Sequence, residues 1–405
     1  MNNVNRKQSR LARRLAAVSA ACALGIVAQF VATQVASAAG AIGAREQAKR
    51  MFDRIAGVPP TEAQIVDMAA DIAAGRAVDA ALKATDAPSF YNVTLKNLVT
   101  PWTNRDMTVF APLNDYTATV IGMVRDDVAF NTALSGDILY TVDSAGVSGG
   151  LPAVSANAND HYEQAEEKGV DLKSHLVATQ QSTVYGTPAA ATAGLITTRA
   201  ASAAFFIAGT NRAMFRFTLI NHLCRDMEQV HDTSRPPDRI RQDVSRSPGG
   251  DSRIFLNNCI GCHSGMDPMA QAFAFYNYDG MDATAGKLVY TPGAVQGKYA
   301  INVDNFKPGF VTPDDAWENR WRHGPNSLLG WSPSLPGSGS GAKSLGQELA
   351  SSEAFAECQV QKVYKAVCFR LPQQSEVNSI KASFKASGYR LRQVFADSAV
   401  ACMGQ

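Results

Sequence analysis

The sequence lacks the excess of positive charge that nucleic-acid binding needs. Its 405 residues include 38 Lys or Arg and 36 Asp or Glu. Residues 1–38 hold five of the basic residues and no acidic one. Without them, 33 basic residues face 36 acidic residues, a net charge of −3. Because DNA- and RNA-binding domains carry clustered positive charge, we expect no nucleic-acid partner.

Long apolar runs are also missing, with one exception near the start of the chain. Five basic residues precede an apolar run from Leu15 to Ala32, and Ala36-Ser37-Ala38 supplies a small-residue cleavage site. This order predicts a signal peptide over residues 1–38 and export to the periplasm or the medium. Retention of the run as an uncleaved anchor is the alternative, since about 20 apolar residues span a bilayer. After cleavage, we expect no membrane span.

Metal and redox motifs are scarce, since the chain contains a single C-x-x-C pair. A zinc finger would need a second ligand pair at finger spacing. A thioredoxin-like dithiol would need a βαβ context, whereas the flanks here are rich in Asn, Ser, Gly and Pro. The segment that is present, Cys259-Ile260-Gly261-Cys262-His263, is the C-x-x-C-H sequence to which c-type haem is attached.

The spacing of this motif has a physical reason. Residues three apart on a helix share a face, so Cys259 and Cys262 can reach the two vinyl groups of one porphyrin. His263 then directs its imidazole to the iron as the proximal ligand. We therefore predict one haem c, with its iron, per chain. Export and haem attachment support each other, because haem c is attached outside the cytoplasmic membrane.

Four cysteines remain outside the leader and the motif. They are Cys224, Cys358, Cys368 and Cys402. An even number in an oxidising compartment predicts two disulfides, for which three connectivities exist.

Helix geometry favours one of these connectivities. Cys358 and Cys368 are expected on one helix, about 15 Å apart, which is beyond bridging distance. The chain then turns at Pro372, runs as a helix, turns again and returns as a helix ending near Cys402. We expect Cys368–Cys402 and, by elimination, Cys224–Cys358.

The pattern of apolar residues predicts a mainly α fold. We expect a helical cytochrome c-like haem segment, flanking helical regions and a C-terminal three-helix unit. The predicted parts are the signal peptide 1–38, a helical region 39–160, a helical region with connector 161–250, the haem segment and linker 251–342, and the C-terminal domain 343–405.

Individual helices are expected where apolar residues repeat with helical period. Thr61 and Gln64 form a capping box for one of them. Segment 232–251 reads as a solvated charged connector, and 336–341 as a flexible linker. The predicted helices are Ala44–Gly57, a helix after Thr61, Asp127–Leu139, Tyr162–Val177 and Ala200–Gln229.

These features together resemble the planctomycete-type cytochrome c proteins. The resemblance implies an exported helical protein that binds haem and transfers electrons. Two departures concern packing near the haem: Ala270 stands where the family has glycine, and Tyr276-Asn277-Tyr278 replaces a more acidic segment. The matching stretches are Ile55–Thr61, Gly194–Thr197, Arg212, Leu223-Cys224, Cys259–Pro268, the aromatic tail Phe273, Phe275, Tyr276 and Tyr278 before Asp279-Gly280, and Leu349–Cys358.

Several residues near the motif have two interpretations. Asp267 either hydrogen-bonds the His263 ring N–H and sets its basicity, or belongs to a helix-ending turn. The aromatic tail either walls the porphyrin or packs in the core, and packing is favoured. His222 beside Cys224 resembles a metal site, but a disulfide is favoured. We expect His161, His175 and His231 at the surface.

The sixth iron ligand divides a carrier from a catalyst. Met281 and His323 are the candidates, with Met269 and Met403 behind them. A closed site suits a monohaem electron carrier that exchanges electrons with redox partner proteins, which we favour. An open site suits a haem oxidase or peroxidase, although the single motif argues against a two-haem peroxidase. A structural surface module with an auxiliary haem is the third hypothesis.

Overall fold

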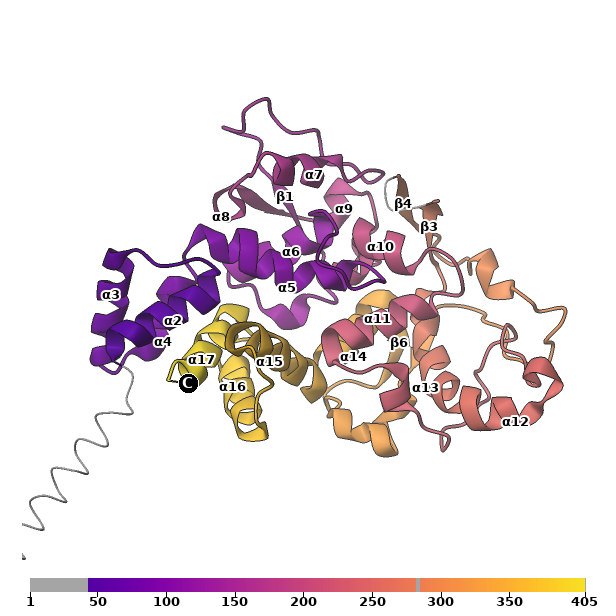
Figure 1. Ribbon diagram of the computed structural model, residues 1–405. Coiled ribbons are helices and arrows are strands. Elements are labelled where there is room, and N and C mark those ends of the chain that lie inside the picture. Colours follow the sequence, from indigo (N-terminus) through magenta and orange to yellow (C-terminus); the bar gives the residue numbers. More distant parts are fainter. Residues whose placement is uncertain (1–42, 282–284, 405) are drawn as a thin grey trace, which may run out of the picture.

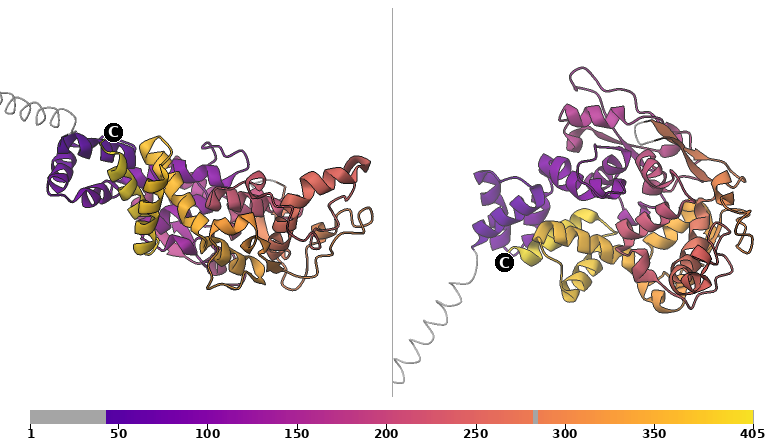
Figure 2. Two further views of the ribbon diagram at one scale, coloured as in Figure 1. Left: turned by 90° about the horizontal axis from the view of Figure 1, so that it is seen from below. Right: turned by 45° about the vertical axis from the view of Figure 1, so that its right-hand side comes forward.

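The computed structural model describes residues 43–281 and 285–404, and its chain is mainly helical (Figures 1 and 2). Three short antiparallel strand pairs accompany the helices. The predicted fold class is thereby confirmed. The predicted signal peptide lies outside the described residues. Among the described residues, no helix is long and apolar enough to cross a membrane.

The N-terminal helices follow their sequence signals. Helix α2 (Ala44–Ala56) ends at Gly57, whose φ of 71° is left-handed and suits glycine. Helix α3 (Glu62–Ala73) begins after Thr61, and the predicted capping box with Gln64 is present. Helix α4 (Ala77–Ala84) completes this group and packs against both.

The next region contains fewer helical residues than predicted. Helix α6 (Asp115–Arg125) ends two residues before Asp127. The predicted helix Asp127–Leu139 is wrong, because no α-helix forms over these described residues. Asp127 has a left-handed φ of 52°, and the chain turns toward strand β1 (Leu139–Val142). Strand β1 pairs with β2 (Leu176–Thr179).

Two other predicted helices are interrupted. Tyr162–Val177 divides into α7 (Asp160–Glu167) and α8 (Leu172–His175), because Gly169 adopts a left-handed φ of 61°. Ala200–Gln229 divides into α10 (Arg199–Phe205) and α11 (Arg212–Leu223), with left-handed residues between them and at Cys224. The short helices α5 (Lys96–Val99) and α9 (Gln181–Val184) complete this region.

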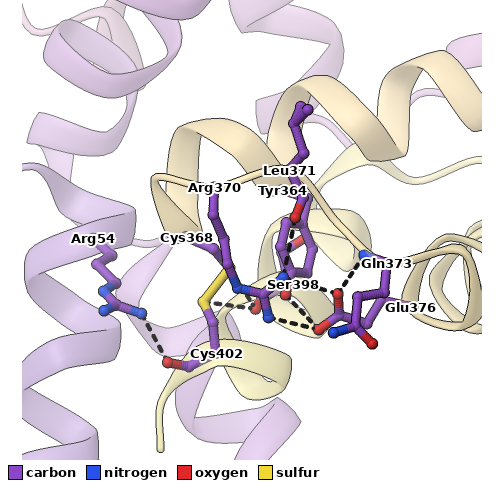
Figure 3. The surroundings of a disulfide bond; sticks show 9 residues. All are labelled: Arg54, Tyr364, Cys368, Arg370, Leu371, Gln373, Glu376, Ser398 and Cys402. Carbon is purple, nitrogen blue, oxygen red and sulfur yellow. Dashed lines mark hydrogen bonds and ion pairs between the residues drawn. A yellow bond between two sulfur atoms is a disulfide. The ribbon is translucent and has the colours of Figure 1, made fainter. Parts of the chain in front are cut away.

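The C-terminal unit contains the three helices that were predicted, and a further helix, α14 (Gly341–Ala350), precedes them. The three are α15 (Glu353–Cys368), α16 (Gln374–Ala386) and α17 (Leu391–Cys402). Cys358 and Cys368 share α15, and the return of α17 places Cys402 against Cys368. The Cys368–Cys402 disulfide is confirmed (Figure 3).

The second disulfide, Cys224–Cys358, is confirmed as well. It joins the end of α11 to α15, so it ties the C-terminal unit to the region that precedes the haem motif. One hydrophobic core also runs without interruption from α2 through the motif helix to α17. The domain boundaries stay predictions.

The predicted flexible linker 336–341 is wrong. Residues Ser338–Ser340 form strand β6, which pairs with β5 (Ala316–Glu318). The small residues allow close packing there: a Cβ at Gly339 would lie 3.1 Å from the Trp317 ring. Composition predicted flexibility, but the partner strand fixes the segment.

Candidate haem site

The C-x-x-C-H motif lies where two helical segments join at one end of the molecule (Figures 1 and 2). Asp251 accepts a hydrogen bond from the backbone of Arg253 and so caps the short helix α12 (Ser252–Ile254). A π-helical turn, Phe255–Cys259, continues into α13 (Ile260–Ala270). Because the backbone is helical throughout, Cys259, Cys262 and His263 lie on one face.

The two motif thiols differ from the other described cysteines. Cys259 and Cys262 are free and partly exposed, whereas the remaining four form disulfides. Burial raises the pKa of the Cys262 thiol, and the nearby Cys259, Glu228 and Asp226 raise it further. Both sulfur atoms are therefore unbridged and partly accessible, as addition to vinyl groups requires.

The imidazole of His263 is held from one side. Its Nδ1 lies 3.1 Å from Oδ1 of Asp267, one helical turn away, and its side chain is 21% exposed. Helix α13 continues through Pro268 to Ala270, so Asp267 does not belong to a helix-ending turn. Of the two interpretations, the carboxylate partner is confirmed. This contact leaves Nε2 as the ring atom that can face an iron.

Asp267 is fully buried and paired with an arginine. Arg212, the first residue of α11, directs Nε to Oδ1 at 2.7 Å and Nη2 to Oδ2 at 2.8 Å. Burial alone would raise the pKa of Asp267, but the Arg212 guanidinium holds it well below its usual range. The carboxylate that contacts His263 is therefore ionised.

A second carboxylate completes this network. Asp243 accepts hydrogen bonds from Nη1 of Arg212 at 2.6 Å and from Nη2 at 2.8 Å. The backbone N–H of Arg241 donates to Oδ2 of Asp267 at 3.3 Å. Both residues belong to segment 232–251, which was predicted to be solvated, and Arg241 is 1% exposed. The prediction is therefore wrong for these two charges, which pair with partners far away in the sequence, whereas most of the segment is exposed or half-buried.

Two glycines let the opposite face of α13 approach its neighbours closely. A Cβ at Gly261 would lie 2.2 Å from Nε2 of His231, and one at Gly265 would lie 1.9 Å from Nε1 of Trp321. The backbone N–H of Asp232 also donates to the Gly261 carbonyl at 2.9 Å. The rear of the motif helix is thus packed, and its cysteine and histidine face is the open one.

No family model, curated protein or solved structure matches this chain.

The aromatic tail after the motif packs in the core, as favoured from the sequence. The Phe273 and Tyr276 rings lie 5.5 and 5.6 Å from Phe206. Strand β3 (Tyr276–Gly280) pairs with β4 (Gly286–Tyr290), and Tyr276 also contacts Tyr290 at 4.9 Å.

The candidates for the sixth ligand occupy different surroundings. Met281 follows β3 and is 95% exposed, and the β3–β4 hairpin lies apart from α13 in Figure 1. His323 follows a 3₁₀ turn, Arg320–Arg322, that packs against α13. Met269 is buried in the hydrophobic core, and Met403 is partly buried and packs against that core. The sixth ligand stays a prediction.

One histidine differs from its sequence interpretation, and for His222 the favoured interpretation, a disulfide at Cys224, is confirmed. His161 is buried rather than at the surface, and its Nε2 accepts a hydrogen bond from the Val142 backbone at 3.0 Å. His222 is buried at 2.8 Å from the Tyr116 hydroxyl, and its neighbour Cys224 is in a disulfide. In the part of the chain that the structure describes, no three His, Cys, Asp or Glu side chains form a metal-binding group.

Sequence reasoning missed Asp243 altogether. It named Arg212 only as a match to a family motif, without assigning it a partner. A local signal was available in hindsight, because Asp243 lies in a charged segment that also contains Arg241. The burial of Asp243, however, depends on its pairing with Arg212 of α11, about 30 residues earlier in the chain.

Proposed function

We propose that this chain is a monohaem c-type cytochrome that transfers electrons. Cys259 and Cys262 would hold one haem c by thioether bonds, and His263 would be its proximal ligand. The observation that carries the proposal is the pair of free thiols beside a histidine whose Nδ1 is already occupied. When bound, the haem supplies the one-electron redox chemistry.

The chain's own residues would tune that chemistry through hydrogen bonds. Asp267 orients the His263 ring and accepts its Nδ1–H, which makes Nε2 a stronger electron donor. Arg212 keeps Asp267 ionised, and Asp243 holds Arg212 in place. A stronger donor favours the oxidised iron, so we expect this network to lower the reduction potential.

The setting we propose is outside the cytoplasm. Two disulfides and the lack of a membrane-spanning helix among the described residues are consistent with an exported protein. A cleaved leader over 1–38 would deliver the chain there, where redox proteins would be its partners. We also propose membership of the planctomycete-type cytochrome c proteins, supported by the order of the motifs.

A haem oxidase or peroxidase is the second candidate. One observation favours it: an ionised carboxylate on the proximal histidine increases electron density at the iron, which assists O–O bond cleavage if the sixth position is open. We favour the carrier, because the sequence contains one C-x-x-C-H motif, which argues against a two-haem peroxidase.

Covalent attachment can be tested by mass spectrometry of the mature protein produced with a haem c assembly system. We expect the polypeptide mass plus one haem. Replacing both Cys259 and Cys262 by Ala should remove that mass. The matched control, in which both Cys368 and Cys402 become Ala, should keep it. A wild-type protein without added mass would refute the proposal.

Optical spectra then separate the two candidates. A carrier should show low-spin bands and bind carbon monoxide slowly when reduced. His263→Ala should leave the thioether bonds but abolish the low-spin spectrum. His323→Ala and Met281→Ala, tested separately, should each be examined for a change to high spin. A native high-spin protein that consumes peroxide rapidly would replace the carrier by the enzyme.

A further inference from the structure

A cavity of about 580 Å³ lies far from the haem motif, where α2, the segment 93–107 and α15 meet. In Figure 1 these elements are separate from α13. Small-molecule sites in proteins occupy about 300–1,000 Å³, so this volume is sufficient for a ligand. Its walls are mostly apolar and include Val93, Leu98, Pro101, Trp102, Met107 and Phe369.

The mouth of the cavity carries exposed apolar side chains. Phe369 is 77% exposed, Met107 is 48% exposed and Val93 is 40% exposed. Phe369 also has a left-handed φ of 56°, which bulky residues rarely adopt. Large apolar side chains gathered around one opening are typical of a surface that another molecule covers.

Lys362 supplies the polar end of the cavity. Its Nζ donates a hydrogen bond to the Asn221 carbonyl at 2.5 Å and lies 4.1 Å from the centre of the Trp102 ring. An ammonium has three N–H donors, so these two contacts with described residues leave one donor unused among them. Burial lowers the pKa of Lys362 to about 7, whereas the carbonyl and the ring both stabilise the charged form.

The charges around the cavity are mainly positive. Arg54 and Lys365 line it together with Lys362, against a single acidic residue, Asp53. Oδ2 of Asp53 is paired with Nζ of Lys49 at 2.6 Å, whereas its Oδ1 is buried without a hydrogen-bond partner among the described residues. An anionic group therefore finds favourable charge at Lys362, while apolar walls surround the rest of the ligand.

We propose that this Lys362 cavity binds a small amphiphilic anion, with its apolar body between Trp102 and Phe369 and its carboxylate on Lys362. This ligand would be bound independently of the haem. A neutral ligand of the same shape would leave the third donor of Lys362 without a partner, and its affinity would be lower.

Octanoate and octan-1-ol distinguish these cases, because they share an alkyl chain and differ in charge. Titration calorimetry of the mature haem-loaded protein at pH 6 keeps Lys362 protonated and octanoate ionised. We expect one octanoate per chain and at least tenfold weaker binding of octan-1-ol. Equal affinities for the two probes would overturn the proposal.

Substitutions locate the site. Lys362→Met keeps the stem but removes the charge, and it should raise the Kd for octanoate about 10- to 100-fold, the range for a charge-assisted hydrogen bond. Lys287→Met changes an exposed residue of strand β4 and should leave the Kd unchanged. Phe369→Asp changes only an exposed rim residue, so it tests the cavity even if Lys362→Met fails to fold. Unchanged binding in Phe369→Asp, or in a folded Lys362→Met, would overturn the assignment.

Discussion

Two arginines on α11 offer a direct test of how burial determines the contribution of an ion pair to the free energy of unfolding. Arg212 and Arg216 are one helical turn apart, and each makes a two-pronged contact with an aspartate. The nearest distance is 2.7 Å in both the Arg212–Asp267 and the Arg216–Asp226 pair. Their surroundings differ: Asp267 is 0% exposed, whereas Arg216 and Asp226 are 48% and 38% exposed.

Arg212→Met should therefore lower the free energy of unfolding far more than Arg216→Met does. Removing Arg212 leaves two buried carboxylates without their main cation, and breaking a buried pair costs about 3–5 kcal/mol. Removing Arg216 breaks a solvated pair, which is worth about 0–1 kcal/mol. Methionine retains much of the arginine stem, so the comparison isolates the guanidinium.

Urea unfolding followed by far-UV circular dichroism measures both free energies of unfolding. The haem-free protein, with Cys259 and Cys262 replaced by Ala, removes any contribution from cofactor binding. A loss below about 1 kcal/mol for Arg212→Met, equal to that of Arg216→Met, would refute the argument from burial. In the haem-loaded protein, Arg212→Met should also raise the reduction potential, because Asp267 loses the charge that keeps it ionised.

Three further outcomes are expected. Replacing Cys368 and Cys402 by Ala should lower the free energy of unfolding by about 4 kcal/mol, the loop-closure value for their sequence separation of 34, and an unchanged urea midpoint would contradict this. A hydrogen bond from Arg370 lowers the pKa of Glu376 to about 2 (Figure 3), below the value of about 4.3 in the unfolded chain. The stability that the ionised Glu376 contributes should therefore be present above about pH 4.3 and be lost between about pH 4 and 2. Glu376→Gln should remove this part of the pH dependence in urea midpoints measured from pH 2 to 7. Gly265→Ala would place a Cβ 1.9 Å from the indole packed on α13, so unfolding measurements should show a loss of about 1–3 kcal/mol.

Features that depend on short stretches of sequence were predictable. The capping box at Thr61 and the glycine end of α2 involve residues within one turn of each other. The same holds for His263 and Asp267, whose spacing of four places them on one helix face. The Cys368–Cys402 disulfide followed because two turns and three helix lengths determine where the chain returns.

Features that depend on distant partners were not predictable. Segment 336–341 reads as a linker by composition, and only its pairing with β5 makes it a strand. Arg241 and Asp243 look solvated in a charged stretch, yet the haem-motif helix and α11 bury them. Burial of charge is decided by pairing across the fold, which composition does not encode.

The positions of the cysteines along the chain bear on the order in which the protein is oxidised. Cys224 and Cys358 are 134 residues apart, and both motif thiols are synthesised between them. Because the chain emerges with its N-terminus first, Cys259 and Cys262 become available to Cys224 well before its native partner Cys358 does. Early oxidation would consume a motif thiol in a mispaired bridge, and haem attachment would then wait for thiol exchange. Under the proposed function, haem must therefore reach the motif thiols before they are oxidised, and late oxidation favours the native product.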